Sequence, residues 1–252
     1  MAHDPRRSRG SVVDLHQENE ALTGFTPPTE RPTVRDNERS FGGRFGVAIE
    51  TRYNDILNAA ADVFARRGYH HASIREIARA ARLSLAGLYH YVGGKDELLF
   101  LTLDRALDTL QGALAGALAT ARTPELRLLA LIRTHLDFGF HHPNELKIVN
   151  RDWEQLSEPR RSEIAGRRHA YVKAGLAILR ELDPHARPGD ELISATNLLL
   201  GMLNGIARPP FLRSGEDARA LAGRVGALFL YGFLERAAVA DTAPARSGGE
   251  AP

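Results

Sequence analysis

Residues 72–98 read ASIREIARAARLSLAGLYHYVGGKDEL, and this stretch decides the expected fold. Ser73 is placed to cap a helix, because its hydroxyl can accept a hydrogen bond from the amide of Glu76 while the Glu76 carboxylate reaches back. A break follows over residues 80–83, and Ser84 is placed to cap a second, shorter helix. Two short helices joined by a tight break are typical of a helix-turn-helix, although a helical hairpin that merely packs has the same spacing.

The sequence on either side of this stretch is also helical in pattern. Residues 47–67 carry apolar side chains at the spacing of one helix face, and Gly68 is well placed to end that helix. A long helix opens at Lys95, with a leucine at every third or fourth position. Further helices are expected over residues 124–141, 143–157, 159–182, 189–207 and 215–238.

The chain shows no sustained alternation of strand-forming and polar residues, so no strand is expected. The predicted fold class is therefore all-α. A three-helix head that contains the helix-turn-helix precedes a larger helical domain. We expect a disordered N-terminal arm at residues 1–46, the head at 47–94, the larger domain at 95–238 and a disordered tail at 239–252.

The positive charge of the chain is concentrated in the head. The 252 residues carry a formal net charge of only +2, but residues 47–95 hold six Arg, one Lys and four acidic residues. A local excess of positive charge is what binding to nucleic-acid phosphates requires, although a solvated basic surface has the same composition.

Composition and motifs exclude several other classes of protein. The absence of cysteine excludes a disulfide framework, a thiolate metal site and a cysteine nucleophile. The most apolar segment, residues 198–206, is far shorter than the roughly 20 residues that a membrane helix needs. The histidine pairs are adjacent rather than four apart, and the chain has neither a phosphate-binding glycine loop nor a Gly-x-Ser-x-Gly motif. We therefore expect a cytoplasmic protein that is not an enzyme and holds no metal or cofactor.

Residues 72–98, together with the preceding VFARRGY at residues 63–69, resemble the DNA-binding head of the TetR family of transcriptional regulators. The rest of the chain matches the ligand-binding and dimerisation domain of that family in length and helical pattern only. The family usually has glycine where Arg82 stands, phenylalanine where Val92 stands and Gly-Thr where residues 86–87 stand. These departures leave the expected fold unchanged but alter the expected contacts with bases.

The resemblance implies a set of DNA-contacting residues. Five residues match the positions at which the family contacts phosphates: Ser73, Ser84, Tyr89, His90 and Lys95. Three arginines are candidates for further contacts or for a solvated surface: Arg52, Arg75 and Arg82. The recognition helix, which would lie in the major groove, begins with three residues that offer bases little beyond apolar contact: Leu85, Ala86 and Gly87. Tyr89 has the alternative of belonging to the core of the head.

The resemblance also implies that the larger domain binds a small molecule and that the long helix at residues 95–120 connects it to the head. Residues 150–180 are similar to TetR-type regulators of fatty-acid and steroid breakdown, which respond to acyl-coenzyme A thioesters. Three arginines would suit the ligand phosphates: Arg151, Arg167 and Arg168. The apolar part of the ligand would meet Leu103, Leu107, Phe138, Trp153, Leu156 and Tyr171. Solvated arginines, a Trp153 that belongs to the core and a generic apolar or aromatic effector remain the alternatives.

In the family the last two helices form a four-helix dimer interface. The matching apolar positions here are Leu192, Ile193, Thr196, Leu200, Leu203, Leu221, Val225, Leu228, Phe229 and Phe233. These residues could instead complete the core of a single chain. The expected function is that of a homodimeric repressor, released from a palindromic DNA operator by a small molecule. A helical small-molecule carrier that does not bind DNA is the alternative.

Overall fold

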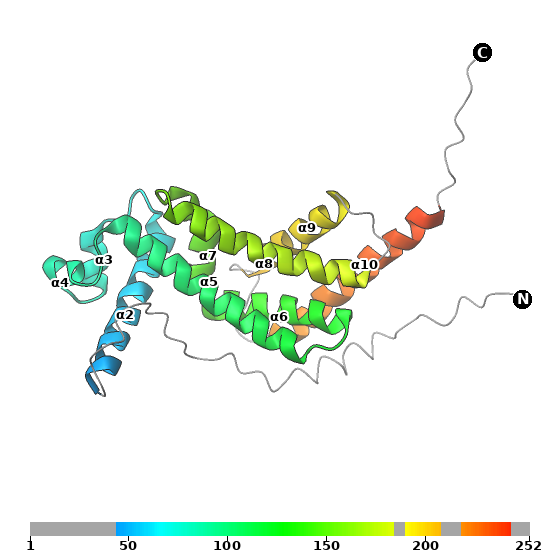
Figure 1. Cartoon of the computed structure of the whole chain (residues 1–252), viewed down its shortest axis with the longest axis horizontal. Helices are drawn as coiled ribbons and strands as arrows, with labels where there is room; N and C mark the ends of the chain where they lie inside the picture. Colours follow the sequence, from blue (N-terminus) through cyan, green and yellow to red (C-terminus); the bar gives the residue numbers. More distant parts are fainter. Residues whose placement is uncertain (1–43, 184–189, 208–217, 243–252) are drawn as a thin grey trace, which may run out of the picture.

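The computed structural model describes residues 44–183, 190–207 and 218–242, and these residues form helices and no strand (Figure 1). The predicted all-α fold is confirmed. The elements are α2 (Arg44–Arg67), α3 (Ile74–Ala80), α4 (Leu85–Tyr89), α5 (Lys95–Thr120), α6 (Pro124–His141), α7 (Pro143–Arg151), the 3₁₀ helix η1 (Trp153–Gln155), α8 (Arg160–Leu182), α9 (Asp190–Ile206) and α10 (Ala218–Thr242). The arm was expected at residues 1–46 and the tail at 239–252, and both predictions are wrong at their inner ends, because residues 44–46 belong to α2 and residues 239–242 belong to α10. The remainder of each segment, residues 1–43 and 243–252, lies outside the described residues.

The helix starts follow from local capping, as the sequence predicted. The Ser73 hydroxyl accepts a hydrogen bond from the Glu76 amide (3.1 Å), and the Ser84 hydroxyl accepts one from the Gly87 amide (2.9 Å). The carboxylate of Glu76 was expected to reach back to the Ser73 amide. In the structure it lies 3.4 Å from Nε of Arg67, so it ties α3 to the end of α2.

Three helices have boundaries that differ from the prediction by more than a residue or two. One is α10, which spans Ala218–Thr242 where residues 215–238 were expected. The single helix expected over residues 143–157 is broken, because α7 ends at Arg151 and η1 follows. At the break, the Asp152 carboxylate is buried and accepts hydrogen bonds from Nε and Nη2 of Arg151 (2.9 and 2.7 Å). Helix α2 also begins three residues before the expected start of the head, at Arg44.

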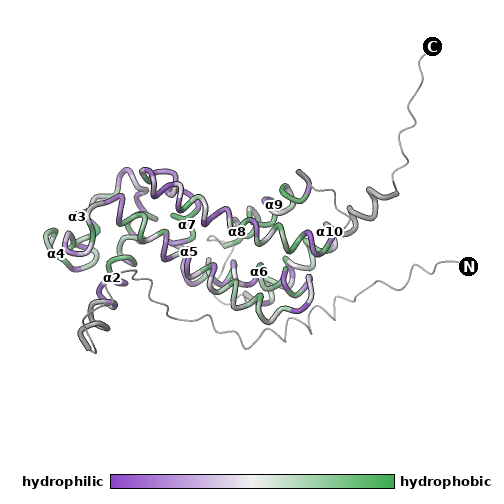
Figure 2. Tube along the Cα trace, viewed as in Figure 1, coloured by the Kyte–Doolittle hydropathy of each residue, from purple (hydrophilic) through white to green (hydrophobic). Residues whose placement is uncertain are grey.

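Helices α2, α3 and α4 form a head at one end of the molecule, and the other helices form a longer body (Figure 1). Helix α5 joins the two parts, since it packs against α2 in the head and against α6, α7 and α8 in the body. Figure 2 shows polar and apolar segments alternating along the body helices, as expected where each turns one face to a core. One hydrophobic cluster runs from Ile56 in the head to Leu230 on α10, so head and body share a continuous core.

Within the described ranges, no helix combines the length and the apolarity that crossing a membrane requires.

Candidate DNA interface and effector domain

The turn between α3 and α4 fixes the angle of the helix-turn-helix. The amide of Leu83 donates to the carbonyl oxygen of Ala78 (2.8 Å), and the amide of Arg82 donates to the carbonyl oxygen of Arg79 (3.0 Å). These two hydrogen bonds together form a Schellman motif. This motif holds Arg82 at a φ of 56°, in the left-handed region. A residue other than glycine pays roughly 1 kcal/mol in that region, which explains the glycine that the family usually has here. Arg82 is exposed, so the head gains a surface cation at this strained position.

The surface of α3 and α4 displays most of the predicted DNA-contacting residues. Seven are exposed: Ser73, Arg75, Arg82, Ser84, Ala86, Tyr89 and His90. Four are partly buried: Arg52, Leu85, Gly87 and Lys95. The side chain of Tyr89 is 49% exposed, so the alternative that Tyr89 belongs to the core is wrong. Ser73 and Ser84 use oxygen lone pairs for their caps, and each hydroxyl hydrogen can still be donated to a phosphate.

The ammonium group of Lys95 is bonded to backbone carbonyls of the same chain and is not free at the surface. Its ammonium nitrogen lies 2.9 Å from the carbonyl oxygen of Tyr69 and 3.1 Å from that of Ala72, and it sits 4.4 Å from the centre of the Tyr69 ring. A third carbonyl, that of His70, is 3.5 Å away. In this structure Lys95 therefore holds the turn before α3 against the start of α5. The predicted phosphate contact stays a prediction, and it requires these bonds to be exchanged.

The three arginines expected to bind ligand phosphates are not brought together as a cluster. Nη2 of Arg151 donates to the carbonyl of Phe64 at the end of α2 (2.6 Å). Arg167 on α8 forms ion pairs with two carboxylates of α5: Asp104 and Asp108. Arg168 donates through Nη1 to the carbonyl of Val149 (2.6 Å), and its guanidinium lies 4.6 Å from the centre of the Trp153 ring. This corrects the expectation of a shared phosphate site, because each guanidinium has its own protein partners.

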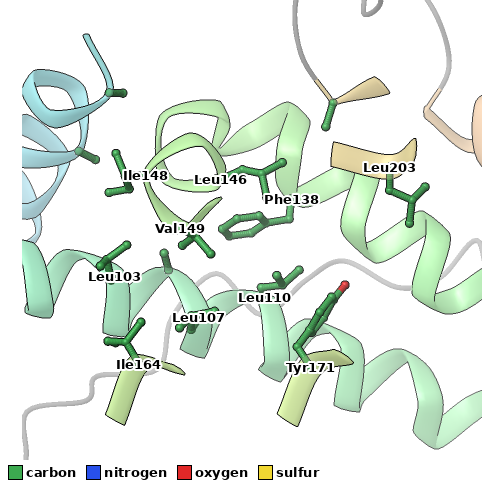
Figure 3. Close-up of a cluster of buried hydrophobic side chains, with 14 of the residues drawn as sticks. Leu103, Leu107, Leu110, Phe138, Leu146, Ile148, Val149, Ile164, Tyr171 and Leu203 are labelled. Atoms are coloured by element: carbon green, nitrogen blue, oxygen red, sulfur yellow. The ribbon is translucent and has the colours of Figure 1, made fainter. Parts of the chain in front are cut away.

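The predicted apolar lining lies inside the body. Leu103, Leu107, Phe138, Leu156 and Tyr171 are buried in the common core, and Trp153 is partly buried at its edge. Figure 3 shows Leu103 and Leu107 on α5 across the cluster from Phe138, with Tyr171 on α8 beside Leu110. These residues come from α5, α6, α8 and the segment after α7, so the structure brings them into one apolar region.

The residues predicted for the dimer interface on the last two helices fall into a buried group and an exposed group. Leu192, Thr196, Leu200, Leu203 and Val225 are buried within the single chain, as the alternative held. Ile193 and Leu228 are exposed, together with two further large side chains: Leu198 and Tyr231. The side chain of Phe233 lies outside the described residues. Helices α9 and α10 therefore each carry exposed apolar side chains, but fewer of the predicted residues are exposed than the sequence suggested.

Comparison with known families agrees with this architecture. The model of bacterial regulatory proteins of the tetR family matches residues 56–101, and the model of a tetracyclin-repressor-like C-terminal domain matches residues 121–209. The chain belongs to the TetR family. This is a family of regulatory proteins, so the expectation of a regulator and not an enzyme is confirmed at the level of the family.

The proteins similar to this chain include named transcriptional regulators and a protein solved with operator DNA. The transcriptional activator FasR of Mycolicibacterium smegmatis is 33% identical over 50% of this chain and 58% of its own length. The ketosteroid regulator KstR2 of Mycobacterium tuberculosis is 25% identical in its solved structure, with a TM-score of 0.63 over 72% of this chain and 94% of that one. AibR, solved with isovaleryl coenzyme A and operator DNA, is 26% identical, with a TM-score of 0.62 over 71% of this chain and 98% of that one. The chain spans 28% and 58% of the first curated relatives that it matches.

A buried polar chain that sequence reasoning missed crosses the body of this TetR-family protein. Nδ1 of His135 lies 3.2 Å from the Tyr171 hydroxyl, and Nε2 of His135 lies 3.2 Å from Oδ1 of Asn204. Nδ2 of Asn150 donates to the same Asn204 oxygen (2.7 Å). Burial lowers the pKa of His135 to about 4, so the imidazole is neutral near pH 7. The available signal was a histidine at a core position of α6, four residues after Leu131.

Several polar contacts fasten the body to the head. Asp96 at the start of α5 accepts hydrogen bonds from the Ser157 amide (2.9 Å) and from Nη1 of Arg160 (2.8 Å). Hydrogen bonds from Ser157 and Arg160 lower the pKa of Asp96, even though burial acts in the opposite direction. These contacts tie the segment between α7 and α8 to the start of the connecting helix α5, and the bond from Arg151 to Phe64 ties the end of α7 to the end of α2.

Proposed function

We propose that the protein is a homodimeric transcriptional repressor that binds a palindromic DNA operator and is released by a small-molecule effector. The observation that carries the proposal is the exposed face of α3 and α4, where hydroxyls, arginines and Tyr89 gather at the tip of a TetR-family head. KstR2, which is named a repressor, matches over 70% of its length, against 58% for the activator FasR. FasR is the more identical of the two, 33% against 28%, so the repressor form of the proposal rests on the longer match to KstR2.

A second copy of the chain is the proposed partner of α9 and α10. Leu198 and Leu228 each leave 69% of their surface exposed, and Ile193 leaves 47%. Glycines beside them, Gly201 and Gly205, have open space around them, which would let a partner helix approach closely. Two heads in a symmetric dimer would read two inverted half-sites about one helical turn, or a multiple of it, apart.

An acyl-coenzyme A thioester is the proposed effector class. The support is the likeness to AibR, whose structure contains isovaleryl coenzyme A, and to the ketosteroid regulator KstR2. Arg168 lies against the Trp153 ring and donates through Nη1 to Val149, and among the described residues its Nε and Nη2 make no hydrogen bond, so these two nitrogens could donate to a ligand phosphate. The apolar core between α5, α6 and α8 would take the acyl part.

The DNA-binding half of this proposal is tested by selecting ligands from random double-stranded DNA with the full chain. We expect an inverted repeat to be enriched, and its binding to weaken steeply as salt rises, because phosphate contacts release counterions. Gel shifts over a range of salt concentrations measure both. If no duplex is enriched while the chain still binds small molecules, the carrier that does not bind DNA becomes the better reading.

The effector half is tested by adding acyl-coenzyme A to the complex with the selected operator. We expect a thioester to release the DNA at concentrations at which the matching free acid and free coenzyme A have no effect. Fluorescence anisotropy of labelled operator follows the release. Equal release by the thioester and the free acid would contradict a role for phosphate contacts.

A further inference from the structure

The polar chain through His135 ends in a hydrogen-bond donor that the protein leaves unused. Oδ1 of Asn204 accepts from both His135 and Asn150, which fixes the amide with its oxygen toward those residues and its nitrogen away from them. Among the described residues, Nδ2 of Asn204 has no hydrogen-bond acceptor. Asn204 is partly buried and Nδ2 keeps some accessible surface, so a ligand atom can reach it.

The geometry fixes where each proton of this array lies. Asn204 presents an oxygen to Nε2 of His135, so Nε2 must carry the imidazole hydrogen and Nδ1 must accept one. The Tyr171 hydroxyl therefore donates to Nδ1. Every donor points the same way along the chain from Tyr171 to Asn204, and such aligned bonds polarise one another. The Asn204 amide, which accepts two hydrogen bonds, is thereby a stronger donor through Nδ2.

The array is uncharged and is set among apolar side chains. His135 and Tyr171 are 3% and 7% exposed, and both pKa shifts, down for His135 and up for Tyr171, favour the neutral forms. The hydroxyl end of Tyr171 points toward the region of Leu203, within the cluster that also holds Phe138 and Leu110 (Figure 3). A carboxylate placed there would lose its hydration without gaining a cation, which is costly, whereas a neutral oxygen needs only one donor.

We propose that Asn204, held by His135, Asn150 and Tyr171, is the polar anchor of the effector site. It takes an uncharged oxygen acceptor on an apolar skeleton: the carbonyl of a thioester, an ester or a ketone. The anchor selects against the carboxylate of the same skeleton. This inference rests on the proposed function, whose effector class it narrows, but it concerns ligand binding and can be tested without DNA.

The test compares a medium-chain methyl ketone, the methyl ester and the carboxylate of the same chain length. Binding is measured by calorimetry on the full chain without DNA, and release of the selected operator is measured in parallel. We expect the ketone and the ester to bind at least about tenfold more tightly than the carboxylate, the difference that one buried unpaired charge easily supplies. Equal or tighter binding of the carboxylate, or no binding of any of the three probes, would overturn the proposal.

Substitutions of Asn204 test whether this residue provides the hydrogen bond to the neutral oxygen of the ligand. Asn204→Leu is expected to weaken ketone binding about tenfold, whereas Asn197→Leu, the same change at an exposed position of α9, is expected to leave it unchanged. If Asn204→Leu does not fold, Asn204→Ala removes the same donor with less bulk, introduces no other donor, and is expected to show the same loss. Wild-type affinity for the ketone in a folded Asn204 variant would overturn the proposal. If the wild type binds the ketone but no operator, the proposed DNA-binding function fails and the anchor stands.

Discussion

Changing Ala86 to Glu is expected to reduce operator affinity on the order of 1000-fold while leaving the fold intact. Ala86 is exposed in the first turn of α4, the helix that would enter the major groove. A carboxylate there would face phosphates and base acceptors, and such like-charge contact costs about 2 kcal/mol or more per head. Two heads in a dimer double that cost, and each 1.4 kcal/mol is a factor of ten in affinity.

The matched control is Ala115→Glu, which adds the same charge at an exposed position of α5, twenty residues beyond the start of that helix. We expect the control to bind the selected operator within a few-fold of wild type. Both variants should keep the wild-type melting temperature, since a glutamate in the first turn of a helix is favourable and one on an exposed helical surface is nearly neutral. Equal losses in both variants would indicate a net-charge effect, and an unaffected Ala86→Glu would place α4 outside the groove.

The parts of this molecule that could be predicted from its sequence are those fixed by neighbouring residues. The caps at Ser73 and Ser84 join atoms three residues apart, so spacing alone revealed them. The roles of the arginines depend on residues far away in the chain: Asp104 lies 63 residues from Arg167, and Phe64 lies 87 residues from Arg151. A guanidinium fits a phosphate and a carboxylate equally well, so residue type could not decide between a ligand and an internal partner.

The same reasoning explains the candidate effector site. Apolar periodicity correctly placed Phe138 and Tyr171 in the interior, because burial follows the helix face. It could not show that His135 from α6 meets Tyr171 from α8 and Asn204 from α9, since that contact is set by how three helices pack. Polar residues at core positions, such as His135, were the one sequence signal of this array.

The second large effect is the loss of stability that we expect when the pH is lowered. Lowering the pH from 7.5 to 5.0 should cost the protein about 2 kcal/mol of unfolding free energy through His135 alone. The folded-state pKa of His135 is lowered to about 4 from an ordinary value of 6.5. Well above pH 6.5 the imidazole is neutral in both states and contributes nothing. Between 6.5 and 4 the unfolded chain binds a proton that the folded chain refuses, so stability falls as the pH falls.

The change that isolates this effect is His135→Gln, because a glutamine amide can still donate toward Asn204 and accept from Tyr171 but does not titrate. Urea unfolding at pH 7.5 and 5.0, at one protein concentration because the proposed dimer makes stability depend on it, gives the loss for each protein. We expect wild type to lose about 2 kcal/mol more unfolding free energy than the variant over this interval.

Carboxylates with lowered pKa, such as Asp96 and Glu145, contribute little to the difference in loss between wild type and variant. The stabilisation from Asp96 and Glu145 is lost as the pH falls from their unfolded pKa values of 3.8 and 4.5 through their lower folded pKa values, an interval that lies mostly below pH 5.0, and both proteins share these groups. Equal losses in wild type and variant would show that His135 can take up a proton in the folded protein, and the neutral array would then be wrong.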